Sequence, residues 1–208
     1  MEFIFFGDSL TAGENCERCD SFCYNITTCK MMIKNLAVSG TTIGEYSIYP
    51  VDGYSLLGRI SVCQNEIRKA DKIFIEYGSN DVSAVMCGFA TVQTVVVSFV
   101  KALDWIRQIN PRAEIYFLTF GDDDVIKNRG ERMCYYLKND YFKEFNFDFP
   151  VSKYCDIYKQ IVDNISKVCD TITMFDSEMV DDKYISDDGI HPNVEGHKRI
   201  ANNIIKQL

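Results

Sequence analysis

Ser9, Asp188 and His191 are the residues of this 208-residue sequence whose types and spacing could cleave an ester. Ser9 comes two residues after Gly7, which ends an apolar run, and by itself it would be a helix N-cap. Asp188 precedes His191 by three residues across a glycine-containing turn, so its carboxylate can reach the Nδ1–H group. That contact would fix the tautomer and leave Nε2 for Ser9. We therefore expect Ser9 as nucleophile, His191 as general base and Asp188 as its orienting residue.

The sequence contains one other histidine, His197, within an expected final helix. Its neighbours in residues 195–198 include a glutamate and a lysine, which favour a surface position. We therefore expect His197 to be structural and take no part in the reaction.

Strand-like and helix-like segments alternate along the chain. Short apolar runs predict strands at residues 3–6, 34–38, 72–77, 113–119 and 171–175. Helical spacing predicts helices at 54–68, 91–109, 151–168 and 194–205. The alternation predicts an α/β fold, a three-layer α/β/α sandwich around a flavodoxin-like, doubly wound sheet of five parallel strands.

Polar segments follow three of the expected strands, at residues 7–10, 39–40 and 78–81. Taken singly, Gly40 would be a turn glycine and Asn80 a turn residue or cap. In a doubly wound sheet, however, ligands bind outside the carboxyl ends of the strands. We therefore expect these three segments to meet at one edge of the sheet.

Four ordered segments resemble the signature blocks of the GDSL esterases, also called SGNH hydrolases. They are Gly7-Asp8-Ser9-Leu10 and residues 35–40, 78–81 and 188–193. The resemblance spans most of the chain. It implies the same catalytic set of Ser9, Asp188 and His191, with no cofactor and no metal.

The resemblance also implies an oxyanion hole, formed by the backbone N–H groups of Ser9 and Gly40 and the side-chain amide of Asn80. A glycine lets its N–H approach the substrate with no Cβ in the way, and an amide is a neutral, directional donor. Asp8 and Asp81 are expected to brace the neighbouring loops.

Composition narrows the class of protein and its partners. The formal net charge is −8 and the basic residues are scattered, which argues against nucleic acid as a partner. No apolar segment approaches the ~20 residues of a membrane span, and the first apolar run is too short for a signal peptide. We expect one domain over residues 1–208 in a cytoplasmic protein, with a secreted mature form as the alternative.

The nine cysteines leave a second interpretation open, because the four early ones are clustered. Cys16, Cys19, Cys23 and Cys29 could bind zinc or form disulfides, or they could be reduced thiols in a loop. This cysteine-rich stretch, residues 14–30, also departs from the regular first helix usual in the family.

Residues 121–150 form an expected insertion that mixes acidic and aromatic side chains. One interpretation is a peripheral helix and loop packed on the domain. The other is a lid or wall that contacts the substrate. Its aromatics could stack on sugar rings, and no long apolar lid suits a fatty chain. We therefore expect a small-molecule or carbohydrate ester as substrate, most simply a short-chain (acetyl) ester on a carbohydrate. A lysophospholipase, a thioesterase and a non-catalytic carbohydrate-binding protein are the alternatives.

Overall fold

The computed structural model describes residues 1–26, 31–46, 54–141 and 149–208. Its centre is a parallel sheet in the order β2-β1-β3-β4-β5. The strands are β1 (Glu2–Gly7), β2 (Met32–Asn35), β3 (Lys72–Glu76), β4 (Glu114–Thr119) and β5 (Asp170–Thr173). This order confirms the flavodoxin-like sheet predicted from the sequence.

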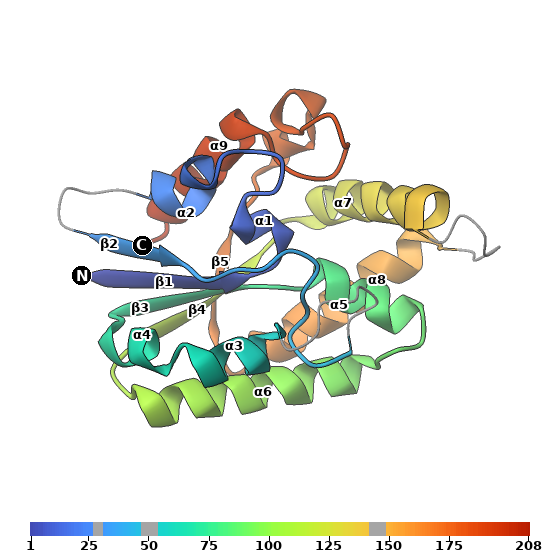
Figure 1. Cartoon of the computed structure of the whole chain (residues 1–208). Coiled ribbons are helices and arrows are strands. Elements are labelled where there is room, and N and C mark those ends of the chain that lie inside the picture. Colours follow the sequence, from blue (N-terminus) through green and yellow to red (C-terminus); the bar gives the residue numbers. More distant parts are fainter. Residues whose placement is uncertain (27–30, 47–53, 142–148) are drawn as a thin grey trace.

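Helices cover both faces of the sheet, which confirms the three-layer sandwich (Figure 1). One face carries α1 (Ser9–Ala12), α2 (Phe22–Asn25) and α9 (Val194–Ile205). The other face carries α3 (Leu56–Val62), α4 (Gln64–Lys69), α6 (Val92–Ile109) and α8 (Val151–Ile165). The core between the layers is rich in aromatic rings, for example Phe5 stacked on Phe74 with centroids 4.6 Å apart.

Two predicted elements differ in their bounds. The expected strand at 34–38 is β2 at Met32–Asn35, although Leu36 and Val38 still donate backbone hydrogen bonds to β1. The helix expected at 54–68 is two helices, because Cys63 leaves helical geometry at φ −104° and ψ 24°. Apolar spacing alone does not register such a break, since the residues on either side still face the core.

Besides the four-residue helices α1 and α2, two longer helices were not assigned from apolar spacing. In α5 (Ser79–Met86) polar residues Ser79, Asn80, Asp81 and Ser83 are buried, so the helix lacks the usual apolar stripe. The second is α7 (Asp123–Tyr136), which begins the expected insertion at 121–150. It packs against α8, where a Cβ at Gly130 would come within 2.9 Å of the Tyr154 ring.

No helix among the described residues is long and apolar enough to cross a membrane. Residues 142–148 of the expected insertion and Cys29 lie outside the part of the chain that the structure describes.

Candidate active site

The turn from β1 into α1 exposes Ser9. Asp8, not Ser9, is the N-cap of α1, because its carboxylate accepts the N–H of Leu10 at 3.0 Å. Ser9 is therefore the first helical residue and its hydroxyl is not used as a cap. Gly7 makes the tight turn possible, since a Cβ there would lie 2.8 Å from the carbonyl oxygen of Glu76.

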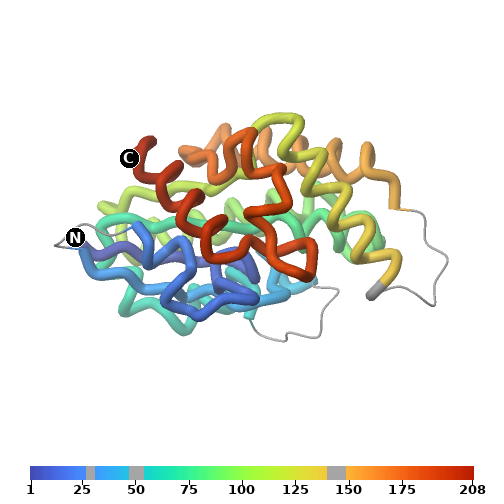
Figure 2. Tube along the Cα trace, turned by 90° about the horizontal axis from the view of Figure 1, so that it is seen from above, coloured from blue at the N-terminus to red at the C-terminus, as the bar shows by residue number. Residues whose placement is uncertain are grey.

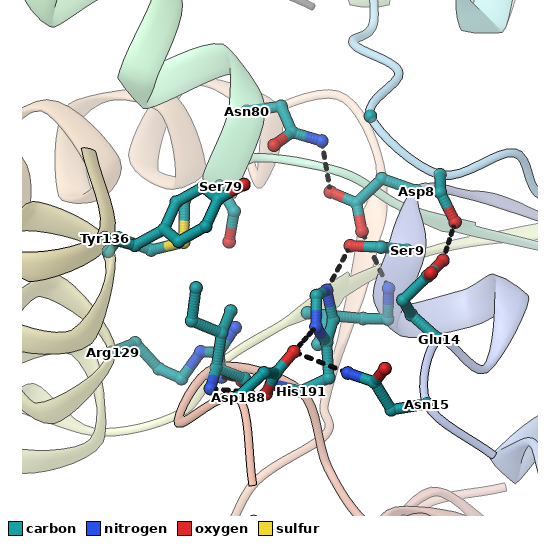
Figure 3. Close-up of a pocket in the computed structure, with 15 residues that line it drawn as sticks. Asp8, Ser9, Glu14, Asn15, Ser79, Asn80, Arg129, Tyr136, Asp188 and His191 are labelled. Carbon is teal, nitrogen blue, oxygen red and sulfur yellow. Dashed lines mark hydrogen bonds and ion pairs between the residues drawn. The ribbon is translucent and has the colours of Figure 1, made fainter. Parts of the chain in front are cut away.

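Ser9, His191 and Asp188 form one continuous hydrogen-bond chain (Figure 3). Oγ of Ser9 lies 2.8 Å from Nε2 of His191, and Nδ1 of His191 lies 2.5 Å from Oδ2 of Asp188. With Nδ1 protonated, Nε2 is the acceptor for the serine proton. The structure thus brings together the three residues that the sequence predicted as a catalytic set.

Asp188 is held in place by several donors besides His191. Its Oδ1 accepts hydrogen bonds from the Ser186 hydroxyl and from the N–H groups of Ile190 and His191, at 2.7 to 3.0 Å. Partial burial would raise the pKa of Asp188, but the hydrogen bonds from His191 and the backbone outweigh it and hold the pKa well below its usual range. The carboxylate therefore stays ionised and can stabilise a protonated His191.

Asn15 was not expected at the site. Its amide donates to Oδ2 of Asp188 at 2.5 Å across a separation of 173 residues. Asn15 has φ 64°, a left-handed conformation that asparagine tolerates better than most residues. The sequence signal was weak, because an asparagine two residues after Gly13 in a cysteine-rich stretch reads as an ordinary turn residue.

The expected oxyanion-hole residues line the same cavity as Ser9. The amide nitrogen of Asn80 donates to the carbonyl oxygen of Thr41 at 2.9 Å and to Oδ2 of Asp8 at 3.2 Å. Donation to a substrate oxyanion would therefore require Asn80 to share or exchange its longer bond, the one to Asp8. Gly40 has φ 76°, which a glycine adopts without strain.

Asp8 and Asp81 brace the loops around the cavity, as expected. Asp81 accepts the N–H of Ile43 at 3.0 Å and the hydroxyl of Tyr46 at 2.8 Å. Burial raises the pKa of Asp81 to about 7 and raises that of Asp8 well above its usual range, where the charge of buried Glu76 adds to the effect. The Asp8 carboxyl accepts the N–H of Leu10 on Oδ1 and the amide of Asn80 on Oδ2, so it ties the turn after β1 to α5.

The cavity has a volume of about 400 Å³ and two different sides (Figure 3). One side is a polar loop wall, which we define as Glu14, Asn15 and Ser39; the hydroxyl of Ser39 donates to the carboxylate of Glu14. The other side is a helix wall, defined as Arg129, Met133 and Tyr136 of α7. The α7 part of the expected insertion thus lines the cavity.

The prediction that His197 lies at the surface is wrong. Its side chain is fully buried, its Nδ1 accepts the N–H of Phe22 at 3.3 Å, and its ring stacks on that of Phe22. The cause is α2, which lies against α9 and covers it (Figure 2). Burial lowers the pKa of His197 to about 4, so the ring is neutral and structural.

The early cysteines do not form a metal cluster within the described part of the chain. Cys16, Cys19 and Cys23 are free thiols there, and no group of three or more His, Cys, Asp or Glu side chains among the described residues could hold a metal ion. Cys23 is buried and its thiol donates to the carbonyl oxygen of Thr11 at 3.7 Å, as a core residue does.

Comparison with known proteins adds solved structures of the same fold. Est24, a carbohydrate acetylesterase from Sinorhizobium meliloti, is 15% identical with a TM-score of 0.65, covering 99% of this chain and 97% of its own. The psychrotrophic esterase EstA from Pseudoalteromonas sp. is 15% identical with a TM-score of 0.62, covering 99% and 97%. The lipase Lip_vut3 from a goat rumen metagenome is 14% identical with a TM-score of 0.62, covering 98% and 95%.

A search of the curated proteins gave no match. The family of GDSL-like lipases and acylhydrolases matches residues 5–199, which include all four signature segments and both sides of the cavity. The chain therefore belongs to the GDSL-like lipase/acylhydrolase family.

Proposed function

We propose that the protein is a serine esterase that cleaves a carboxylic ester through an acyl-enzyme on Ser9. The observation that carries the proposal is the hydrogen-bond chain from Oγ of Ser9 through His191 to Asp188, which opens into a cavity. A nucleophile, a base and an orienting carboxylate in contact are what acyl transfer requires.

In the first step, Oγ of Ser9 attacks the acyl carbon while Nε2 of His191 takes the hydroxyl proton. The tetrahedral oxyanion is stabilised by the N–H groups of Ser9 and Gly40 and by the amide of Asn80. His191 then gives its proton to the departing alcohol, and the acyl group remains on Ser9. In the second step, His191 takes a proton from a water molecule while the water oxygen attacks the acyl carbon. His191 then gives this proton to Oγ of Ser9 as the bond between Oγ and the acyl group breaks and the acid leaves.

We further propose that residues 1–208 act as one domain and that the substrate carries a short acyl group, most simply acetyl, on a carbohydrate. The cavity is small, at about 400 Å³, and its loop wall is polar. Solved structures of this fold include the carbohydrate acetylesterase Est24 and a family two carbohydrate esterase from Clostridium thermocellum. Esters of acetate, butyrate and decanoate with one alcohol test the acyl length, and faster cleavage of decanoate would favour a lipase or lysophospholipase.

The nucleophile is tested with Ser9→Ala. We expect this substitution to lower kcat by a factor on the order of 10⁴ or more with no loss of thermal stability, because it removes only the attacking oxygen. A fluorophosphonate should add its mass to Ser9 in the native protein and should leave the variant unlabelled. Labelling of another residue, or full turnover in Ser9→Ala, would contradict the proposal.

A further inference from the structure

Arg129 is a buried cation at the edge of the candidate active site. It lies in α7, its side chain is 2% exposed, and it lines the same cavity as Ser9 and His191 (Figure 3). One guanidinium nitrogen donates to the carbonyl oxygen of Ile190. The Nε of Arg129 has no hydrogen-bond partner among the described residues.

Arg129 makes no direct ion pair with the other residues that the structure describes. Within the described ranges, none of the carboxylates lies within 4 Å of the guanidinium, whereas Arg132 on the same helix pairs with Asp182 at 2.6 Å. The rings of Phe120 and Phe175 lie 5.4 and 5.6 Å away, close enough for a partial cation–π contribution. A buried charge without a direct partner is costly, and burial accordingly lowers the pKa of Arg129.

The two buried acids nearby, Asp8 and Glu76, do not supply that partner. Oε2 of Glu76 accepts the hydroxyl of Thr11 at 2.9 Å, and its Oε1 has no partner among the described residues. Burial raises the pKa of both carboxyl groups, and the charge of Arg129 opposes that rise without a direct ion pair. The guanidinium therefore has no carboxylate in direct contact among the described residues, and its Nε is left without a partner.

We propose that Arg129 binds a negatively charged group of the substrate, so that the preferred substrate is an anionic ester. This inference rests on the proposed esterase function and names the class of its substrate. A guanidinium has five N–H donors in a planar fork, which suits a carboxylate or another oxyanion.

The charges on the two sides of the cavity give the anion a direction. Glu14 of the loop wall carries a carboxylate on the side opposite Arg129, as Figure 3 shows. Glu14 repels an anion and Arg129 attracts it, so the charged part of the substrate lies along the helix wall. The anion can belong to the acyl group or to the alcohol, and both would use the same contact.

Pairs of charged and neutral esters show whether the anion belongs to the acyl group or to the alcohol. 4-Methylumbelliferyl acetate is the neutral ester, and 4-methylumbelliferyl hemisuccinate carries a carboxylate on the acyl side. 4-Acetoxybenzoate carries one on the alcohol side, with methyl 4-acetoxybenzoate as its neutral match. We expect the wild type to show a higher kcat/KM for at least one anionic ester than for its neutral match.

The deciding variant is Arg129→Met, which keeps an unbranched apolar side chain in the core and removes the charge. It should lower kcat/KM for the preferred anionic ester about 10- to 100-fold more than kcat/KM for its neutral match, as expected for loss of a charged hydrogen bond. Arg129→Lys should retain part of the preference. Arg132→Met is the matched control, because Arg132 also donates to a carbonyl of the same turn, that of Gly189, but does not line the cavity.

Several outcomes would overturn the inference. One is a wild type that prefers the neutral member of both pairs, a result that needs no variant to fold. Another is a folded Arg129→Met protein, with the wild-type circular dichroism spectrum, that keeps the anion preference. A third is an equal loss of preference in Arg132→Met, which would indicate a general effect on the turn.

Calorimetric binding in a Ser9→Ala background separates this inference from the proposed function. Ser9→Ala should bind the hemisuccinate or the acetoxybenzoate more tightly than its neutral match, and Ser9→Ala/Arg129→Met should not. Anion binding without any ester turnover in the wild type would refute the esterase and keep the anion site. Turnover of neutral esters with no binding preference would refute the anion site and keep the esterase.

Discussion

The two histidines of the chain lie six residues apart and have opposite environments. His191 is partly exposed to the cavity, with a carboxylate on Nδ1 and a hydroxyl on Nε2. His197 is fully buried against Phe22, and its Nε2 has no partner among the described residues. The difference teaches that the partners of the two ring nitrogens, together with burial, decide whether a histidine can act as a base. Burial opposes a charged ring at His197, whereas Nδ1 of His191 lies 2.5 Å from the carboxylate of Asp188 and Nε2 faces Ser9.

The largest expected effect separates the two histidines by activity. His191→Gln should lower kcat by a factor on the order of 10⁴, because it removes the base that is hydrogen-bonded to Oγ of Ser9. His197→Phe should change kcat less than a few-fold, since that ring does not reach the cavity. Steady-state kinetics on one acetyl ester measures kcat of both variants. A comparable loss of kcat in the two would contradict the different roles assigned to His191 and His197.

A smaller effect concerns His197 and the free energy of unfolding at low pH. An ordinary histidine has a pKa near 6.5, and burial lowers that of His197 to about 4. As the pH falls below about 6.5, the unfolded chain takes up this proton before the folded protein does, so stability is lost between pH 6.5 and 4. The loss amounts to about 3 kcal/mol by pH 4.

His197→Phe should remove this contribution, so its free energy of unfolding should fall less steeply with acid. Urea titrations at pH 7, 5.5 and 4.5 compare the slopes of the variant and the wild type. Identical pH dependence in wild type and His197→Phe would contradict the buried, neutral state of His197.

The smallest effect concerns Asn15, which acts through Asp188 as a positioning residue. Asn15→Gly keeps the left-handed backbone and removes the amide that donates to Oδ2. We expect kcat to fall by about 3- to 10-fold with KM unchanged, because the lost hydrogen bond acts on the reaction only through Asp188. The amide donates to Oδ2, the oxygen that faces Nδ1 of His191, so its loss leaves more negative charge on that oxygen and should move the acid limb of the activity profile to higher pH.

Ser186→Ala is the matched control for Asn15, because it removes a donor to the other oxygen of the same carboxylate. The two variants should shift the acid limb in the same direction. A change in KM alone, with the profile unmoved, would show that Asn15 contacts substrate and does not position Asp188.

Much of the fold follows from patterns that are local in the sequence. The strands β1, β3, β4 and β5 lie within about one or two residues of their predicted bounds, because buried parallel strands are short continuous apolar runs. The helix α9 was predicted at 194–205 and lies at Val194–Ile205. Ser9, Asp188 and His191 could be proposed because each follows a strand or a turn that carries a recognisable motif.

The missed features depend on contacts that are distant in the sequence. The burial of His197 comes from α2, which is far away along the chain and has no strong helical pattern. Arg129 looks like a surface residue of a polar helix, since arginine is rarely buried. Arg129 is buried because α7 packs against the rest of the domain, which places its side chain beside Phe120 and Phe175. Asn15 likewise gains its meaning from Asp188, 173 positions later.

The hydrogen bond between Ser9 and His191 joins positions 182 residues apart. Closing a contact of such large sequence separation costs loop entropy, which is lowest when the intervening chain is already ordered. Hydrolysis by this pair would therefore report whether the sheet and α9 have both assembled. The circular dichroism of helices such as α6 and α8 does not report this, because it measures helix content alone. In a refolding experiment, recovery of turnover should mark the final closure of the molecule, and loosening of α9 should abolish turnover while most helical signal remains.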